Sequence, residues 1–411
     1  MKSLKLLAMG SMALAAASLA SAATNIKITG STAFRKATTQ AILHTLNSGY
    51  TVAADGTDIS GANRVTIVGT LTSTSDAVVI QCAWAGSVGG VAVLDGGLTT
   101  IPGVTYNSAH TWIKASKATQ SVALGGTAGS PTFSAITALT TTEQADSANF
   151  DSAATADIAL SDTYQSSTDY NVNGLADDIV GAVTFAWTKG VNNNTGNSAF
   201  TAAYARLTNI TTQQAQALLN NGDVPLSMLT GVAADSAYRV VLTGRNNDSG
   251  TRLTTFAESG FGITTPPVQY SVNASTGALT PFAPTDGYSS SSTVKTVLTT
   301  ATTAGTSVIN SGGSDKPYIL LSYVGTGTIT AQQLTYNGAT FSNLAVQEGQ
   351  YNFWGYEHVL RSPAIAGVAD TFATDLVTQL TGSDDATTNG VRFSTMRVNR
   401  QIDGGLINTN L

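Results

Sequence analysis

Segments that read as strands alternate along this chain with segments that read as helices, and this alternation limits the possible folds more than any other feature. The run Arg64–Leu71 is rich in β-branched residues, as strands are. The run Asn209–Gly222 reads as a helix, because Thr211 and Gln214 can form a capping box at its start and Gly222 can end it. Strands that alternate with helices are typical of α/β units, so we predict an α/β fold with mostly parallel sheets.

Four of the expected strands end in turns that carry glycine or hydroxyl residues. In the last of these turns, Arg245 precedes Ser249-Gly250-Thr251 and a helix that we expect to end at Gly260. The first turn of such a helix offers free N–H groups, which together with hydroxyls and a guanidinium suit an oxyanion. Ligands of open α/β sheets bind at the carboxyl ends of the strands, so we predict that the turns converge on one anion site. The four turns lie within Ile28–Thr38, Trp84–Leu94, Ser161–Asp162 and Leu242–Gly262.

The order and spacing of these turns resemble those of the periplasmic phosphate-binding proteins that serve ABC-type phosphate uptake. Arg245 precedes Ser249-Gly250-Thr251 by three intervening residues, as in that family, and the stretches GSTAF, GSVGG and ALSD are similar to its other ligand-binding turns. The resemblance covers most of the chain. It implies that phosphate is bound by Ser31, Thr32, Ala33, Phe34, Ser87, Asp162, Arg245, Ser249, Gly250 and Thr251.

The implied site residues divide into three chemical roles. Arg245 supplies a formal positive charge and a planar fork that suits two phosphate oxygens. The serine and threonine hydroxyls donate neutral hydrogen bonds. Asp162 provides selectivity, because phosphate near neutral pH still carries a proton, with a second pKa of roughly 6 to 7, and a carboxylate can accept its hydrogen bond. Sulfate has no such proton, so a buried carboxylate opposes it.

Two positions depart from the family pattern. The family usually has an aspartate two residues after the arginine, where this chain has Asn247, and Asp248 is displaced by one. The family also has a proline after the aromatic residue of its first turn, where this chain has Arg35. Sulfate and molybdate therefore stay open as alternatives to phosphate. A cell-surface scaffold that kept the fold without a ligand is a further alternative.

The resemblance implies a two-lobed periplasmic-binding-protein architecture with a mostly parallel sheet in each lobe. Lobe 1 is discontinuous and comprises residues 24–181 and 361–411, whereas lobe 2 comprises residues 189–350. Hinge strands at 182–188 and 351–360 join the lobes. Two segments, at about 116–149 and 264–315, are rich in serine and threonine with little periodicity. We expect both of these segments to be surface insertions.

The first 22 residues predict export from the cytoplasm. Lys2 and Lys5 precede an apolar run from Leu6 to Leu19 and a small-residue cleavage site, which is the pattern of a signal peptide. No cysteine follows the cleavage site, so we expect no lipid anchor and a periplasmic or otherwise extracytoplasmic location. The net charge of −6 argues against a nucleic-acid-binding protein. The resemblance implies inorganic phosphate and an ABC-type permease in the inner membrane as partners, and we expect a monomer.

We expect no enzymatic activity, no metal and no cofactor. The three histidines have no metal-ligand spacing, and no serine lies in a nucleophile elbow. Cys82 lies in an apolar strand, so a buried structural thiol is expected rather than a catalytic one. The segment 169–178 resembles a calcium loop but has Val180 at the position of the bidentate glutamate, which favours a plain polar turn.

Overall fold

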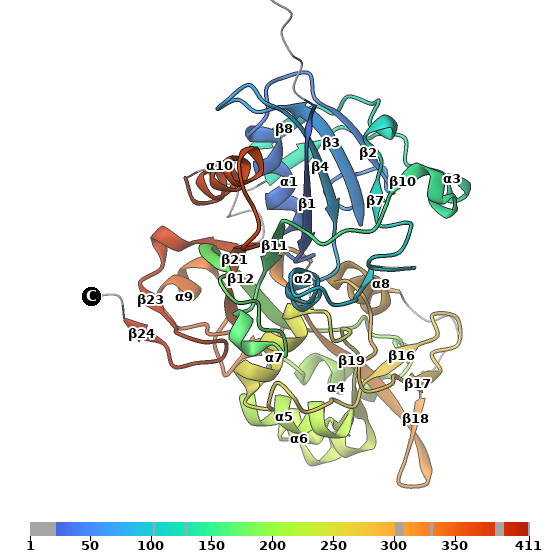
Figure 1. The fold of residues 1–411 in the computed structure, drawn as a ribbon. Helices are drawn as coiled ribbons and strands as arrows, with labels where there is room; N and C mark the ends of the chain where they lie inside the picture. Colours follow the sequence, from blue (N-terminus) through green and yellow to red (C-terminus); the bar gives the residue numbers. More distant parts are fainter. Residues whose placement is uncertain are drawn as a thin grey trace, which may run out of the picture.

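The structure is a computed structural model that describes residues 22–101, 103–127, 130–300, 308–328, 332–382 and 390–409 (Figure 1). Residues 1–21, which hold nearly all of the predicted signal peptide, lie outside this part. The fold is a mixed α/β fold, as predicted. Among the described residues, no helix has both the length and the apolar character needed to cross a membrane.

One sheet of twelve strands forms the centre of the molecule. Its order is β14 (Asp223–Pro225), β15 (Arg239–Leu242), β19 (Ser314–Gly325), β12 (Ala176–Lys189), β21 (Trp354–Arg361), β11 (Ile158–Ser161), β1 (Thr24–Gly30), β4 (Ala77–Ala83), β3 (Arg64–Thr70) and β2 (Thr51–Ala54). In addition, β18 (Val308–Ser311) pairs with β19, and β22 (Gly390–Arg392) pairs with β12.

The prediction of mostly parallel sheets is wrong. Three strand pairs of this sheet are parallel, namely β1 with β4, β1 with β11, and β15 with β19. The other eight described pairs are antiparallel. The reason is that β2, β3 and β4 follow one another as antiparallel neighbours, while β12 and β21 return through the middle of the sheet between its two parallel parts.

Ten helices are described, and six short strand pairs complete the fold. The helices are α1 (Arg35–His44), α2 (Ser87–Leu94), α3 (Thr141–Ala145), α4 (Ser198–Arg206), α5 (Thr212–Asn221), α6 (Ser227–Thr230), α7 (Gly250–Ser259), α8 (Ser291–Thr299), α9 (Asn343–Gln347) and α10 (Val368–Gly382). The short pairs are β5 (Thr100–Ile101) with β6 (Val104–Thr105), β7 (Trp112–Ile113) with β10 (Phe150–Asp151), β8 (Leu124–Thr127) with β9 (Ser130–Phe133), β13 (Asn209–Ile210) with β20 (Thr335–Tyr336), β16 (Tyr270–Val272) with β17 (Leu279–Pro281), and β23 (Val398–Asn399) with β24 (Asn408–Thr409).

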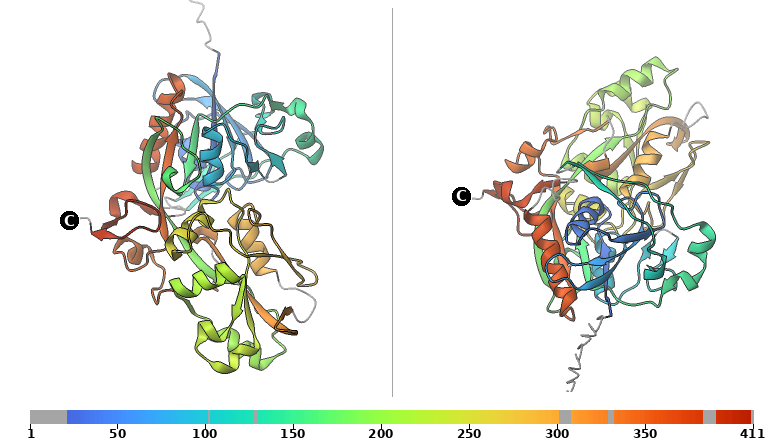
Figure 2. Two further views of the ribbon diagram at one scale, coloured as in Figure 1. Left: turned by 60° about the horizontal axis from the view of Figure 1, so that its bottom comes forward. Right: turned by 90° about the horizontal axis from the view of Figure 1, so that it is seen from above.

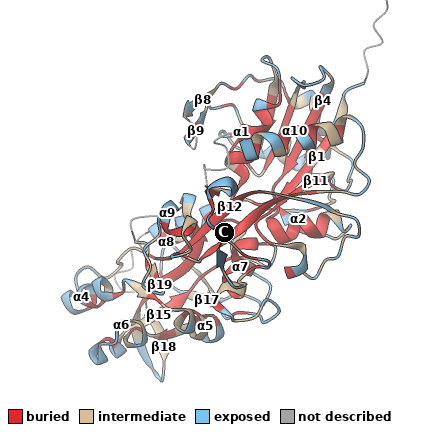
Figure 3. Cartoon of the chain, turned by 90° about the vertical axis from the view of Figure 1, so that its left-hand side faces the viewer, coloured by how far each residue is buried: buried red, intermediate tan, exposed pale blue. Residues whose placement is uncertain are grey.

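The elements gather in two groups at the two ends of the sheet (Figures 1 and 2). In group 1, α2 packs on β1 and β11, while α1 packs on α10, which contacts β1 and β12. In group 2, α5 and α7 pack together and α8 packs on β19. Most strands of the sheet are buried along most of their length, whereas exposed residues lie mainly on helix surfaces, in loops and in the β18–β19 hairpin (Figure 3).

The long strand β12 belongs to both groups. Its residues 176–184 pair with β21, and its residues 185–189 pair with β19. The backbone therefore passes from group 1 to group 2 near Thr184, within the segment 182–188 that was expected to be a hinge. Strand β12 begins within the segment 169–178 that resembles a calcium loop. Asp177 of that segment is paired in the strand, and its carboxylate lies 2.7 Å from Nδ1 of His358.

Local signals in the sequence have mixed outcomes. The capping box of Thr211 and Gln214 is present at the start of α5, and left-handed glycines end α5 and α7 at Gly222 and Gly260, as predicted. The stretch from Ser31 to Gly49 also predicts a helix that is capped by Ser31 or Thr32 and ends at Gly49, but α1 spans only Arg35–His44.

Two further predictions concern burial. Cys82 is buried in β4, as expected, and burial raises the pKa of its thiol. The prediction that segment 264–315 is a surface insertion is wrong for its central part. There, Val294 and Leu298 of α8 are buried against β19, because their apolar side chains complete the core of group 2.

Candidate anion-binding site

Three of the four predicted turns meet at the Asp162 carboxylate. Ser87, the first residue of α2, donates a hydrogen bond from Oγ to Oδ1 of Asp162, which follows β11. A Cβ atom built on Gly250, the first residue of α7, would overlap with that same Oδ1 and lie 2.7 Å from the Cβ of Ser87. Only glycine therefore permits the start of α7 to approach this carboxylate. Since α2 and β11 belong to group 1 and α7 to group 2, the contact joins the two groups.

Arg245 contacts the remaining one of the four predicted turns, which follows β1. Its Nη2 lies 3.4 Å from Oγ1 of Thr32, in the turn after β1. The same guanidinium donates from Nε to the carbonyl of Tyr288 at 3.0 Å, from Nη2 to the carbonyl of Ser289 at 2.8 Å, and from Nη1 to Oγ of Ser291 at 3.1 Å. The side chain is thus held in a fixed position, and the residue is only 1% exposed.

The turn after β1 is fixed by the neighbouring strand β11. Gly30 has φ of +110°, and a Cβ atom there would overlap with the carbonyl oxygen of Leu160. The N–H of Ser31 donates to that carbonyl at 2.7 Å. Ser31 Oγ accepts from the N–H of Phe34 at 3.2 Å, so the hydroxyl closes the turn just before α1. Ala33 lies in the same turn, and a Cβ atom on Gly325 would be 3.7 Å from its Cβ.

The start of α7 shows why the sequence folds this way locally. Ser249 is the N-cap, and its Oγ accepts from the N–H of Arg252 at 3.2 Å. A serine hydroxyl that accepts in this way keeps its own hydrogen for donation. Thr251 is buried in the first turn of the helix. Asp248, just before the cap, accepts the N–H of Gly89 through its carbonyl at 3.2 Å, which ties the starts of α2 and α7 together.

The electrostatics of the site rest on two buried, oppositely charged groups. Desolvation raises the pKa of Asp162 to about 6, although the hydrogen bond from Ser87 and the charge of Arg245 oppose this shift. Desolvation also lowers the pKa of Arg245 to about 10, and the charge of Asp162 opposes it. Both groups are therefore mostly charged at neutral pH. Yet no ion pair between described residues includes Arg245. A buried cation without a direct carboxylate partner is costly, and an anion placed here would offset that cost.

The structure also brings residues to the site that the sequence reading did not select. Tyr288, Ser289 and Ser291 contact Arg245, although they come from the segment that was expected to be a surface insertion. The feature of the sequence that could have indicated these residues is the run of four serines from Ser289 to Ser292. Serine often caps helices, and Ser290 is the N-cap of α8. Glu357 of β21 is fully buried, and desolvation, followed by the nearby charge of Asp162, raises its pKa well above the usual range.

A cavity of about 180 Å³ borders the site. Its wall includes Thr32 and Ser291, the two hydroxyl residues that contact the Arg245 guanidinium. Arg35 and Lys36 at the start of α1 also line it. Arg35 stands where the family has a proline in its first turn. This difference was the only feature of the sequence that pointed to Arg35 as a residue near the site. Among the described residues, no group of three or more histidine, cysteine, aspartate or glutamate side chains could hold a metal ion.

Comparisons with known proteins give a remote likeness. No protein-family model matches the chain, and no curated protein matches it. Among solved structures, the chain is similar to an ABC-type phosphate transport receptor from Vibrio cholerae, with 13% identity, a TM-score of 0.41, and 87% of this chain and 97% of that chain covered. A putative phosphate ABC transporter substrate-binding protein with bound phosphate from Clostridium perfringens gives 11% identity, a TM-score of 0.44 and coverage of 90% and 99%. A DING protein gives 12% identity, a TM-score of 0.40 and coverage of 89% and 90%.

Proposed function

We propose that this chain is an extracytoplasmic solute-binding protein that captures an oxyanion between its two groups of elements. The observation that carries this proposal is Arg245, a buried guanidinium without an ion pair among the described residues, held beside hydroxyls and helix N-termini from both groups. Such donors are desolvated and directed, so they bind an anion without relying on the long-range field of a negatively charged protein.

The particular ligand that we propose is inorganic phosphate. Asp162 favours it over sulfate, because with a pKa of about 6 this carboxylate is mostly ionised at neutral pH and accepts a hydrogen bond. Protonated phosphate can donate that hydrogen bond, whereas sulfate would place a lone pair against a buried negative charge. Like charges opposed in a desolvated site cost several kcal/mol, so the discrimination amounts to orders of magnitude.

The proposed mechanism is closure of two lobes on the ligand followed by delivery to an ABC-type permease. In this proposal lobe 1 comprises residues 24–181 and 361–411, lobe 2 comprises residues 189–350, and the segments 182–188 and 351–360 act as hinges. The contacts from Arg245 to Thr32 and from the start of α7 to Asp162 cross between the groups, which supports closure round the site. No chemical step is proposed, so the protein acts as a binding protein rather than an enzyme.

Isothermal titration of phosphate-free protein with phosphate, sulfate, arsenate and molybdate tests the proposal. We expect phosphate and arsenate to bind, and Arg245→Gln to weaken phosphate binding at least about 100-fold, since a charged hydrogen-bond donor is lost from a buried site. Arg397→Gln is the matched control, because Arg397 has a side chain that is 72% exposed. Equal affinity of wild type and Arg245→Gln would remove Arg245 from the site. Tight binding of sulfate or molybdate alone would assign another oxyanion, and no binding of any of the four would favour a scaffold without a ligand.

A further inference from the structure

The cavity beside Arg245 is lined by cationic groups that one phosphate ion bound at Arg245 would not neutralise. Two of its lining residues, Thr32 and Ser291, have hydroxyls in contact with the guanidinium of Arg245, so the cavity and the proposed phosphate position share a wall. Two further cationic residues line the cavity, namely Arg35 and Lys36. The carboxylate of Asp58 also lies there.

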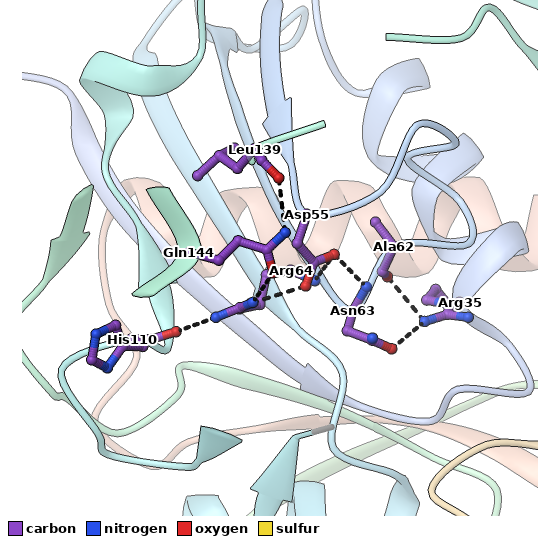
Figure 4. A network of polar contacts seen from close by, with 8 residues as sticks. All are labelled: Arg35, Asp55, Ala62, Asn63, Arg64, His110, Leu139 and Gln144. Atoms are coloured by element: carbon purple, nitrogen blue, oxygen red, sulfur yellow. Dashed lines mark hydrogen bonds and ion pairs between the residues drawn. The ribbon is translucent and has the colours of Figure 1, made fainter. Parts of the chain in front are cut away.

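Arg35 is also buried, beside the backbone of Ala62 and the side chain of Asn63 (Figure 4). It is 6% exposed, and the hydrogen bonds described for its guanidinium are donated by Nη1, to the carbonyl of Ala62 at 2.9 Å and to Oδ1 of Asn63 at 3.2 Å. The nearby carboxylate of Asp55 forms an ion pair with Arg64 instead, with 2.9 Å between Nε of Arg64 and Oδ2 of Asp55. Within the described part of the chain, no ion pair includes Arg35.

The cavity is also lined by one carboxylate, that of Asp58, so its lining carries two formal positive charges and one negative charge. Oδ1 of Asp58 accepts the N–H of Ser60 at 2.9 Å and its Oγ–H at 2.8 Å. On the opposite wall, Ser291 and Ser292 are in the first turn of α8, whose helix dipole adds partial positive charge. Burial lowers the pKa of Arg35 to about 10, which leaves the side chain charged at neutral pH. The cavity is thus an electropositive, hydroxyl-lined space.

We infer that this cavity accepts a second anionic group joined to the one on Arg245, so that the protein binds a diphosphate such as inorganic pyrophosphate. The inference rests on the proposed oxyanion site and extends its ligand class. One phosphoryl group occupies the position at Arg245 and Asp162, and the other enters the space between Arg35, Lys36 and the start of α8. A neutral substituent in the same place would add no counter-charge for Arg35 to those of Asp55 and Asp58.

Titration with three probes tests this assignment: phosphate, pyrophosphate and methyl phosphate, which has a neutral substituent. We expect pyrophosphate to bind wild type at least about tenfold more tightly than methyl phosphate, because two cations and a helix terminus act on its second group. Ser292→Glu places a negative charge at the cavity, and glutamate in the first turn of a helix does not harm folding. This variant should weaken pyrophosphate binding about tenfold and phosphate binding less than about threefold.

Ser292→Gln is the matched control, since it has the size of glutamate without the charge. Any loss that it causes measures the effect of side-chain size, so it should weaken pyrophosphate binding clearly less than Ser292→Glu does. The inference is overturned if phosphate binds and pyrophosphate does not, or if Ser292→Glu leaves pyrophosphate binding unchanged. It is also overturned if Ser292→Glu weakens both ions equally. If neither ion binds wild type, the proposed function and the inference both fail. Pyrophosphate binding that is sensitive to Ser292→Glu, without phosphate binding, would support the inference and refute phosphate as the ligand.

Discussion

Replacing Asp162 with asparagine removes a carboxyl group whose pKa is raised from 3.8 to about 6, mainly by desolvation. A carboxyl pKa that is higher in the folded than in the unfolded protein means that the folded protein holds the proton more tightly. The free energy of unfolding therefore falls as the pH rises from about 4 to about 6, because an ionised carboxylate must then be kept buried. A shift of about two pKa units corresponds to about 3 kcal/mol above this window, at about 1.4 kcal/mol per unit.

The asparagine variant avoids this cost, so its stability relative to wild type should improve with pH. In ligand-free protein we expect the difference in unfolding free energy between Asp162→Asn and wild type to shift by about 2 kcal/mol in favour of the variant from pH 4 to pH 7. The figure is below 3 because the unfolded carboxyl is already partly ionised at pH 4. Urea denaturation of both proteins at the two pH values, in phosphate-free buffer, measures this double difference.

The double difference cancels the titration of groups that both proteins share and that do not interact with Asp162, such as Glu258, whose pKa is also raised by burial. Asp315→Asn is the control substitution, because Asp315 is exposed in the β18–β19 hairpin. A difference between Asp162→Asn and wild type that stays constant from pH 4 to pH 7 would refute the reasoning. The carboxylate would then be solvated in the folded protein, and its proposed role in rejecting sulfate would lose its physical basis.

Two further substitutions test the packing of the site and of the C-terminal segment. Gly250→Ala should abolish oxyanion binding in a titration, because its methyl group would overlap with Asp162 Oδ1. Gly382→Ala, whose methyl group would meet no atom within 4 Å, should leave binding unchanged. Normal binding by Gly250→Ala would mean that the turns do not meet as described. Arg400→Ala should lower the unfolding free energy by about 3 kcal/mol, because it leaves Glu258 buried without its partner at 2.8 Å. Burial raises the pKa of Glu258 to about 7, so the loss should be larger at pH 8 than at pH 5, and equal losses at the two pH values would contradict this account.

The parts of the fold that could be predicted are those governed by neighbouring residues. A capping box needs only Thr211 and Gln214, and a helix stop needs only a glycine that can adopt positive φ, so α5 and the end of α7 follow from short stretches. The turns that converge on Asp162 were predicted for a similar reason. Each combines a strand end with a glycine or a hydroxyl within a few residues, and α/β sheets bring strand ends together.

The parts that could not be predicted depend on contacts between distant residues. The residue pattern of a strand does not record the direction of its partner, so the antiparallel majority of the sheet was missed. Likewise, serine is a common helix cap, but Oγ of Ser31 closes the turn onto Phe34 while its N–H donates to the carbonyl of Leu160, which is far along the chain. Among the described residues Arg35 has no ion pair, and Asp55 pairs with Arg64 instead, which only the folded structure reveals.

In the proposed function, the guanidinium groups of Arg245 and Arg35 and the buried carboxylate of Asp162 would link binding to closure. Arg245 comes from group 2, whereas Arg35 and Asp162 come from group 1, so the proposed closure would bring their charges together. Without an anion, the desolvation of these two guanidinium groups would oppose closure, because neither has a direct ion pair among the described residues to offset it. An anion between them supplies the missing counter-charge and shifts the equilibrium by its differential affinity for the closed form. A protein built in this way would stay open until the correct anion arrives, and Asp162 would decide which anion is correct.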